Sequence, residues 1–395
     1  MGDSLFFFLI ILTLLAAILR ADFVLTLLYL LLGVYIAGRL WSRRALHAVQ
    51  ARRSFVPRVF FAEKVPVILE IENKSLLPVV WLQLHESLPP ELTTAGLFRR
   101  VVSLGPREKM RFEYLLEGRK RGFYRIGPLR LNSGDVFGIS EDLQASIEAD
   151  TLTVYPRMVP ITRLGLPSRS PQGALKHRLP VFEDPSRVYG RRDYVAGDSL
   201  RRVDWKSTAS TGRLQVKLFE PSIALETVIL LNLNAAEYEY RTRIDATELG
   251  IVAAASIASW VTSLRQAVGL VTNGVDPLHE NSLPPPVPAR RGRAHLRRIL
   301  DVLARVQSAE TCPLVELLQR QVLHFPWGTT LVLITPNLDS DLFDGLFQAQ
   351  RSGMSVVLVP CGPVPNFPEA RRRAEYFGFP LYPLLSERDL EAWRQ

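Results

Sequence analysis

Cysteine and histidine, whose side chains bind metals and act as nucleophiles or bases, are scarce in this sequence. The 395 residues include two cysteines and six histidines. Cys312 and Cys361 lie far apart and have no cysteine or histidine neighbours at ligand spacing. This pattern indicates a reducing compartment and argues against a disulfide framework or a zinc site.

Common catalytic motifs are also missing. The sequence has no Gly-rich loop ending in Gly-Lys-Ser/Thr, no His-Glu-x-x-His and no Gly-x-Ser-x-Gly. The scattered histidines are His47, His85, His177, His279, His295 and His324. None falls within 188–221, the most distinctive stretch of the chain, so an ordinary acid/base triad is not available there.

Acidic residues are fewer than basic ones, 39 against 48, which gives a formal net charge of +9. We interpret the excess as a cytoplasmic face near anionic lipid. Nucleic-acid binding is the weaker alternative, because no recognisable binding module is present. The length is sufficient for two or three domains with a proper core.

The first forty residues carry very few charges. Two apolar runs, Leu5–Leu19 and Phe23–Ala37, are separated by Arg20-Ala21-Asp22. We predict two transmembrane helices within 1–41. A signal peptide is disfavoured, because the start Met-Gly-Asp-Ser has no positive charge and a second apolar run follows. A helical hairpin buried in a soluble core is the remaining alternative.

A basic juxtamembrane segment, 42–54, follows the second run. Arginines flank this run on its C-terminal side, whereas the loop between the runs has one Arg and one Asp. These flanking residues are Arg39, Arg43, Arg44, Arg52 and Arg53. The positive-inside rule places them in the cytoplasm. We therefore expect a multi-pass cell-membrane protein with two spans and with most of the chain cytoplasmic.

Residues 55–160 show short strands with turn punctuation and no helical period. Val65, Val67, Leu69 and Ile71 alternate with polar or less buried positions, and 99–104 and 110–116 look like a hairpin. This pattern is typical of an antiparallel sandwich of immunoglobulin-like type. Such a domain is either a spacer, which we favour, or a partner-binding module. Residues 161–187 are predicted to be a linker.

Charged and aromatic residues alternate through the signature stretch, 188–221. Gly197 and Gly212 mark turns, and Asp198 is a candidate N-cap for a helix that carries Leu200, Val203 and Ser207 on one face. After Gly212 the period changes to two, with Leu214, Val216 and Leu218 on one side, which predicts a strand. The residues that we single out are Arg192, Tyr194, Gly197, Asp198, Arg201, Asp204, Trp205, Lys206, Gly212, Lys217 and Glu220.

These residues resemble the signature of the bacterial family catalogued as domain of unknown function 58. The match also includes Val203, Thr208, Ala209, Leu214, Val216 and Phe219. Ser210 is a departure, since the family usually has arginine there. The family has no established reaction. The resemblance implies a membrane anchor, a degenerate von Willebrand factor A-like domain, and as partners a MoxR-type AAA+ ATPase and a transglutaminase-like membrane protein.

Strands alternate with helices from 222 to 395. Buried strands are predicted at 227–233, 267–272, 329–334 and 355–360, and helices at 246–264, 296–306, 314–323, 342–351 and 370–377. This alternation predicts an α/β fold with a mostly parallel, doubly wound sheet covered on both faces. The order is similar to that of a von Willebrand factor A domain, which is what the resemblance implies here.

Domains of this type often bind a divalent cation through an Asp-x-Ser-x-Ser loop after the first strand. The matching positions here are Asn232, Asn234 and Ala236. The leading carboxylate is an amide, and the last hydroxyl is missing. Because hard cations need oxygen ligands that include charged ones, we expect no metal and no other cofactor. Metal-dependent adhesion through this domain would require Asn232 and Asn234 to lie in a cation cage.

Three roles compete for the signature stretch. We favour a structural latch, with Trp205 wedged between domains and Asp198 and Asp204 bound to Arg201, Arg202 or Lys206. A partner-docking surface is the second. The third is a metal-dependent hydrolase or nuclease that uses the carboxylates of Asp193, Asp198 and Asp204. The resulting prediction is a non-enzymatic, membrane-anchored interaction or scaffold protein that assembles or maintains envelope complexes with an ATPase.

Overall fold

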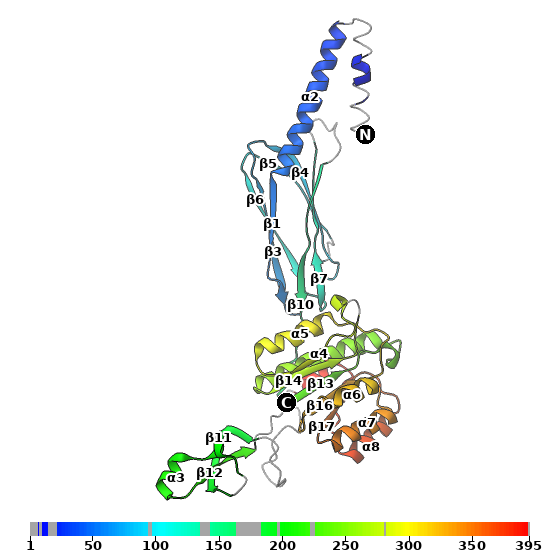
Figure 1. The fold of residues 1–395 in the computed structure, drawn as a ribbon. Coiled ribbons are helices and arrows are strands. Elements are labelled where there is room, and N and C mark those ends of the chain that lie inside the picture. The colour runs from blue at the N-terminus through cyan, green and yellow to red at the C-terminus, as the bar shows by residue number, and fades with distance from the viewer. Residues whose placement is uncertain are drawn as a thin grey trace. The chain divides into compact units, whose positions relative to one another are not determined.

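The computed structural model describes residues 7, 10–14, 22–93, 97–134, 143–162, 183–195, 198–221, 226–279 and 282–393. The chain divides into two compact units, 1–157 and 158–395, except that 303–305 group with the first. Figure 1 labels the helices and strands of both units.

The first unit contains a long apolar helix, α2 (Asp22–His47). Most large apolar side chains in its first half are exposed, among them Phe23, Leu27 and Leu30. Within the described residues, α2 and α4 (Arg243–Ser263) are long and apolar enough to cross a membrane, but α4 is mostly buried inside the second unit. The predicted N-terminal apolar helix is therefore confirmed at 22–47. The other predicted span lies largely outside the described residues. Of this span the structure describes 7 and 10–14, which are helical.

Strands form the rest of the first unit, in three sheets of order β1-β3-β6, β5-β4-β8-β9 and β2-β10-β7. Their bounds are β1 Val49–Ser54, β2 Arg58–Val59, β3 Lys64–Asn73, β4 Val79–Ser87, β5 Leu97–Leu104, β6 Lys109–Glu117, β7 Gly122–Ile126, β8 Leu129–Ser133, β9 Leu143–Ile147 and β10 Asp150–Val154. The predicted alternation in β3 is confirmed, because Val65, Val67, Leu69 and Ile71 are all buried. Leu69 and Ile71 share one core with Leu84 of β4 and Leu131 of β8.

The predicted hairpin of 99–104 with 110–116 is wrong. β5 pairs with β4, and β6 pairs with β3, so the two strands belong to different sheets. The period of two indicates which face of each strand is buried, but it does not indicate the neighbouring strand. The sequence also missed β1, which pairs with β3 and makes the β region begin at Val49 rather than at 55.

The second unit is built on a five-stranded sheet of order β15-β14-β13-β16-β17. All neighbours are parallel except β15 with β14. The predicted α/β alternation is confirmed, and the antiparallel edge strand β15 was missed. The strands are β13 Glu226–Leu231, β14 Ala267–Thr272, β15 Val287–Arg290, β16 Thr330–Thr335 and β17 Ser355–Pro360, and the helices besides α4 are α5 Arg293–Arg305, α6 Leu314–Val322, α7 Ser340–Arg351, α8 Phe367–Phe377 and α9 Glu387–Ala392.

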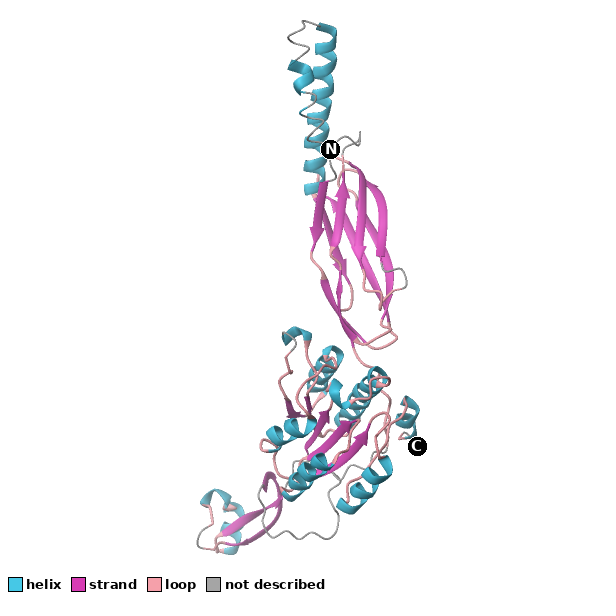
Figure 2. Ribbon diagram, turned by 90° about the vertical axis from the view of Figure 1, so that its right-hand side faces the viewer, coloured by secondary structure: helices cyan, strands magenta, loops and turns pink. Residues whose placement is uncertain are grey.

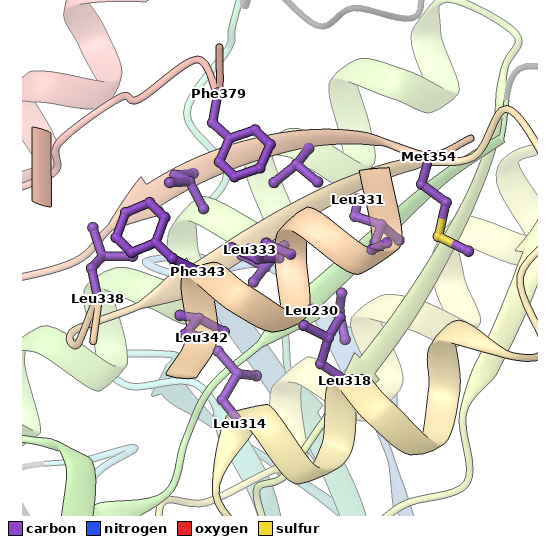
Figure 3. Close-up of a cluster of buried hydrophobic side chains, with 14 of the residues drawn as sticks. Leu230, Leu314, Leu318, Leu331, Leu333, Leu338, Leu342, Phe343, Met354 and Phe379 are labelled. Carbon is purple, nitrogen blue, oxygen red and sulfur yellow. The ribbon is translucent and has the colours of Figure 1, made fainter. Parts of the chain in front are cut away.

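Helices cover the sheet on both faces (Figure 2). On one face, Leu230 and Leu333 of the strands pack with Leu318 of α6 and Phe343 of α7, as Figure 3 shows. On the other, α4 packs against β13, β14 and β16. Central strands buried on both faces explain the continuous apolar runs in the sequence.

The signature stretch forms a hairpin of β11 (Glu183–Asp193) and β12 (Gln215–Pro221), which pair antiparallel. The strand predicted after Gly212 is confirmed. β11 begins inside the predicted linker and was missed there. The part of the linker at 163–182 lies outside the described residues, as does Gly197.

The single helix predicted after Asp198 is wrong. A short 3-10 helix, η1 (Leu200–Arg202), and an α-helix, α3 (Trp205–Thr211), are separated by Val203. Val203 bridges to Val216 of β12, and both side chains are buried. The backbone is therefore extended at Val203, and a new helix begins with Asp204, not Asp198, as its N-cap. Gly212 ends α3 in the left-handed conformation with φ 69°, so its predicted turn is confirmed.

Candidate functional site

Two clusters of polar side chains bring the candidate residues together: one in the hairpin, the other where β13 ends. In the hairpin, both oxygens of Asp198 accept hydrogen bonds from the guanidinium of Arg192, at 2.6 and 2.7 Å. The backbone amide of Val195 donates to the same carboxylate at 3.0 Å. These hydrogen bonds, that from Arg192 first, lower the pKa of Asp198. Asp198 therefore fixes the turn that follows β11.

Asp204 has a different set of partners. Its carboxylate accepts from the backbone amide of Ser207 at 3.3 Å and pairs with the guanidinium of Arg191 at 2.9 Å. Burial acts to raise the pKa of Asp204, but the Ser207 hydrogen bond and the charges of Arg191 and Lys217 outweigh it, so the pKa is lowered. Asp204 thus caps α3 and ties it to β11.

The signature carboxylates each contact a different donor. Asp193 accepts a hydrogen bond from the side-chain amide of Gln215, whereas Asp198 and Asp204 bind arginines of β11. The expected ion pairs of Asp198 and Asp204 are present, but the sequence assigned them to arginines or lysine of the helical segment. Arg191 and Arg192 face Lys217 and Val216 of β12, and Asp198 and Asp204 lie in the segment that joins the two strands. The ion pairs therefore depend on β11.

The remaining signature residues fall into two groups. The backbone amide of Tyr194 donates to Leu214 at 2.8 Å, and Lys217 and Glu220 lie in β12, so these residues belong to the strand framework. Arg201, Trp205 and Lys206 are exposed, with 67% of Trp205 accessible to solvent. An exposed indole among cations is available for contact with another molecule.

The second cluster lies at the carboxyl end of β13. Asn232 and Asn234 are buried, and Ala236 is exposed. The side-chain oxygen of Asn232 accepts from the backbone amide of Asn234 at 3.0 Å and from the side-chain amide of Asn273 at 2.9 Å. The side-chain oxygen of Asn234 accepts from the backbone amides of Ala236 at 3.3 Å and Thr311 at 3.1 Å. Both amide oxygens are therefore already bound by N–H groups.

Glu237 completes this network. Its Oε2 accepts from the Asn232 side chain at 2.7 Å, and its Oε1 accepts from the Asn234 side chain at 3.1 Å. The same Oε1 accepts from the backbone amide of Leu314, the first residue of α6, at 3.0 Å. A carboxylate at a helix N-terminus is favoured by the helix dipole. Glu237 thus gathers the free N–H groups of two asparagines and one helix.

The arrangement at this edge is that of a closed hydrogen-bond network. Asn232 also donates to the Thr335 hydroxyl at 3.1 Å, and its carbonyl accepts from the Tyr238 hydroxyl at 2.6 Å. Burial raises the pKa of Tyr238 well above its usual range, which keeps this hydroxyl a donor. No group of three or more His, Cys, Asp or Glu able to hold a metal occurs in the described part of the chain.

Sequence reasoning missed Glu237 and Asn273. Asn273 follows β14 directly, and its side-chain amide donates to the backbone carbonyl of Cys312 at 2.9 Å. Its place after a buried parallel strand, next to β13, was an available signal. Asp339 caps α7, since its carboxylate accepts from the backbone amide of Leu342 at 2.9 Å.

Comparison with protein families gives a match to the family described as "Protein of unknown function DUF58" over residues 190–325. This confirms the resemblance over nearly all of the signature stretch, from residue 190 onward, and over the α/β region through α6. The chain is also 26% identical over 284 residues to the "Uncharacterized protein YeaD" of Bacillus subtilis (strain 168), a match that covers 70% of this chain and 67% of that protein.

Solved structures show more distant likenesses. A von Willebrand factor type A protein from Catenulispora acidiphila is 14% identical, with a TM-score of 0.30, over 46% of this chain and 42% of the other. The CARDB domain of the PF1109 protein from Pyrococcus furiosus, solved with di-metal ions, is 16% identical, with a TM-score of 0.21, over 27% of this chain and 91% of the other.

Proposed function

We propose that this chain is a membrane-anchored, non-enzymatic interaction protein that docks a protein partner through the signature hairpin. The observation that carries the proposal is the exposure of Trp205 beside Arg201 and Lys206, while Asp198 and Asp204 are bound by Arg192 and Arg191. Tryptophan and arginine are over-represented among residues that contribute most to protein–protein binding. Exposed side chains of this kind suit a docking surface.

The anchor in this proposal is the apolar N-terminal region. α2 exposes Phe23, Leu27 and Leu30, and its C-terminal end carries Arg43 and Arg44. A cell-membrane location with two spans, and a cytoplasmic β region and α/β region, would follow from the positive-inside rule. In this view the β region is an immunoglobulin-like sandwich and the α/β region a von Willebrand factor A-like domain without a cation.

The partner comes from the family resemblance. We propose a MoxR-type AAA+ ATPase, with a transglutaminase-like membrane protein as a further component, in the assembly or maintenance of envelope complexes. A hydrolase at the signature carboxylates is less well supported, because Asp193, Asp198 and Asp204 are held by separate donors. Joint acid/base or metal chemistry needs such groups to converge on one reacting atom.

The test is affinity capture from the protein's own cells, after crosslinking and detergent solubilisation. The samples are the unaltered chain, Trp205→Ala, Asp204→Asn and the control Trp327→Ala, which removes another half-exposed indole. We expect an ATPase with the unaltered chain and the control, and its loss from Trp205→Ala at unchanged thermal stability. Undiminished capture by a folded Trp205→Ala protein would refute the docking surface, and lowered stability would favour the latch.

A further inference from the structure

The tip of the signature hairpin presents cations around apolar side chains. We define the hairpin tip as Leu200, Arg201, Trp205, Lys206, Arg213 and Leu214. Leu200, Trp205 and Leu214 are 64%, 67% and 42% exposed. The carboxylates of Asp198 and Asp204 are occupied by arginines of β11, whereas Arg201, Lys206 and Arg213 form no ion pair with any described residue. The tip therefore suits an acidic surface that also exposes apolar groups.

The α/β region of the same chain carries a surface of this composition. We define the α7–α8 face as Asp341, Asp344, Phe347, Tyr376 and Phe377. The α7 members follow one another at intervals of three, so they lie on one side of the helix. Phe347 is 39% exposed and Tyr376 is 85% exposed. The ring centroid of Phe377 lies 5.3 Å from that of Phe347 and 5.2 Å from that of Tyr376.

The charge of this face is available for binding. Asp341 and Asp344 are exposed and form no ion pair with any residue that the structure describes. In contrast, Arg371 and Arg373 of α8 are paired with Glu375 and Glu369, at 3.0 and 2.9 Å. On α7 the unpaired charge beside the aromatic rings is acidic, opposite in sign to that of the hairpin tip, while the exposed Arg372 of α8, four residues before Tyr376, adds one cation to the same side.

We infer that the hairpin tip of one copy docks on the α7–α8 face of a second copy. The two surfaces complement each other in charge, with three cations against two carboxylates, and in apolar character, with Trp205 against exposed aromatic rings. Each chain carries both surfaces, so the contact joins two different patches and builds a head-to-tail assembly. This inference rests on the proposed docking role of the hairpin and adds a second copy of the chain as a further occupant, which competes with the ATPase for the same surface.

A charge swap tests the contact. The full chain, purified in detergent, is compared by light scattering with Lys206→Glu/Arg213→Glu, with Asp341→Lys/Asp344→Lys, and with the control Arg297→Glu/Arg298→Glu on α5. We expect self-association of each of the first two variants to weaken about tenfold or more, and that of the control to stay unchanged. The chain that combines both pairs of substitutions should regain self-association.

Mixing the two variants distinguishes contacts between chains from contacts within one. Each variant carries a different affinity tag. The acidic hairpin tip of the Lys206→Glu/Arg213→Glu chain should bind the basic α7–α8 face of the Asp341→Lys/Asp344→Lys chain. The two variants should therefore be captured together better than either variant captures a copy of itself. The inference would be overturned if the α7 variant self-associates as well as the unaltered chain does. It would also be overturned if the combined chain does not regain self-association, or if the two tagged variants are not captured together. If the α7 variant is unaffected and Trp205→Ala still loses the ATPase, the proposed function stands without this contact.

Discussion

The side-chain amide of Asn232 donates to Oε2 of Glu237 at 2.7 Å. The two residues follow β13 closely, at its carboxyl end. Here an amide donor meets a carboxylate, and Glu237 also binds Asn234 and the first backbone amide of α6. Both carboxylate oxygens of Glu237 are therefore already bound by N–H donors of the protein.

Replacing Glu237 should destabilise the α/β region. In Glu237→Ala the side-chain amide of Asn234 and the backbone amide of Leu314 lose their acceptor, and the side-chain amide of Asn232 keeps only the Thr335 hydroxyl. We expect a loss of about 1–3 kcal/mol in the free energy of unfolding, measured by chemical denaturation of the detergent-solubilised chain. Glu239→Ala, which removes an exposed carboxylate nearby, is the control and should be neutral. Equal effects of both substitutions would show that Glu237 does not hold the network together.

Magnesium should not stabilise the unaltered chain. Asn232→Asp, however, brings a second carboxylate against Glu237 in a buried position. We expect this variant to unfold at a lower temperature, because two like charges repel, and to recover part of the loss with millimolar Mg²⁺. Thermal unfolding with Mg²⁺ and with a chelator measures both effects. Stabilisation of the unaltered chain by Mg²⁺ would contradict the closed network.

The buried ion pair of Arg53 with Glu86 should contribute strongly to the integrity of the β region. Arg53 of β1 and Glu86 of β4 have side chains 1% and 0% exposed, and the Tyr114 hydroxyl donates to Glu86 at 2.6 Å. Arg53→Met leaves a buried carboxylate without its cation and should cost about 3–5 kcal/mol. The double variant Arg53→Met/Glu86→Gln should be less destabilised than Arg53→Met, as chemical denaturation can show. A double variant at least as unstable would argue against the unpaired charge as the cause.

Acid should loosen the hairpin. The pKa values of Asp198 and Asp204 are lowered in the folded chain, so their ion pairs stabilise it fully above the usual aspartate pKa of about 3.9. This stabilisation is lost as the pH falls through the lower, folded pKa values. The difference in fluorescence between the unaltered chain and Trp205→Phe isolates the indole of α3. We expect the fluorescence of Trp205 to change below about pH 4 in the unaltered chain but not in Asp198→Asn/Asp204→Asn. If the same change occurs in that double variant, other groups cause the transition.

The sequence alone determined most of the α/β region. Apolar runs such as 267–272 and 355–360 match β14 and β17, because helices cover the sheet on both faces and nearly all residues of these strands are buried. The signature residues were also recognisable, since their order along the chain is a local property. The long apolar helix α2 was predictable from the composition of its segment alone.

Contacts between distant segments were decided by the tertiary structure. The ion pair of Arg191 with Asp204 depends on β11, which begins in a segment that reads as a linker, and the extended Val203 depends on Val216. Likewise, β5 and β6 have the pattern of a hairpin but pair in different sheets, because periodicity sets the buried face and not the neighbour. The network of Asn232 with Glu237, Asn273 and Leu314 joins the ends of separate elements, and only the packed sheet brings their hydrogen-bonding groups within reach.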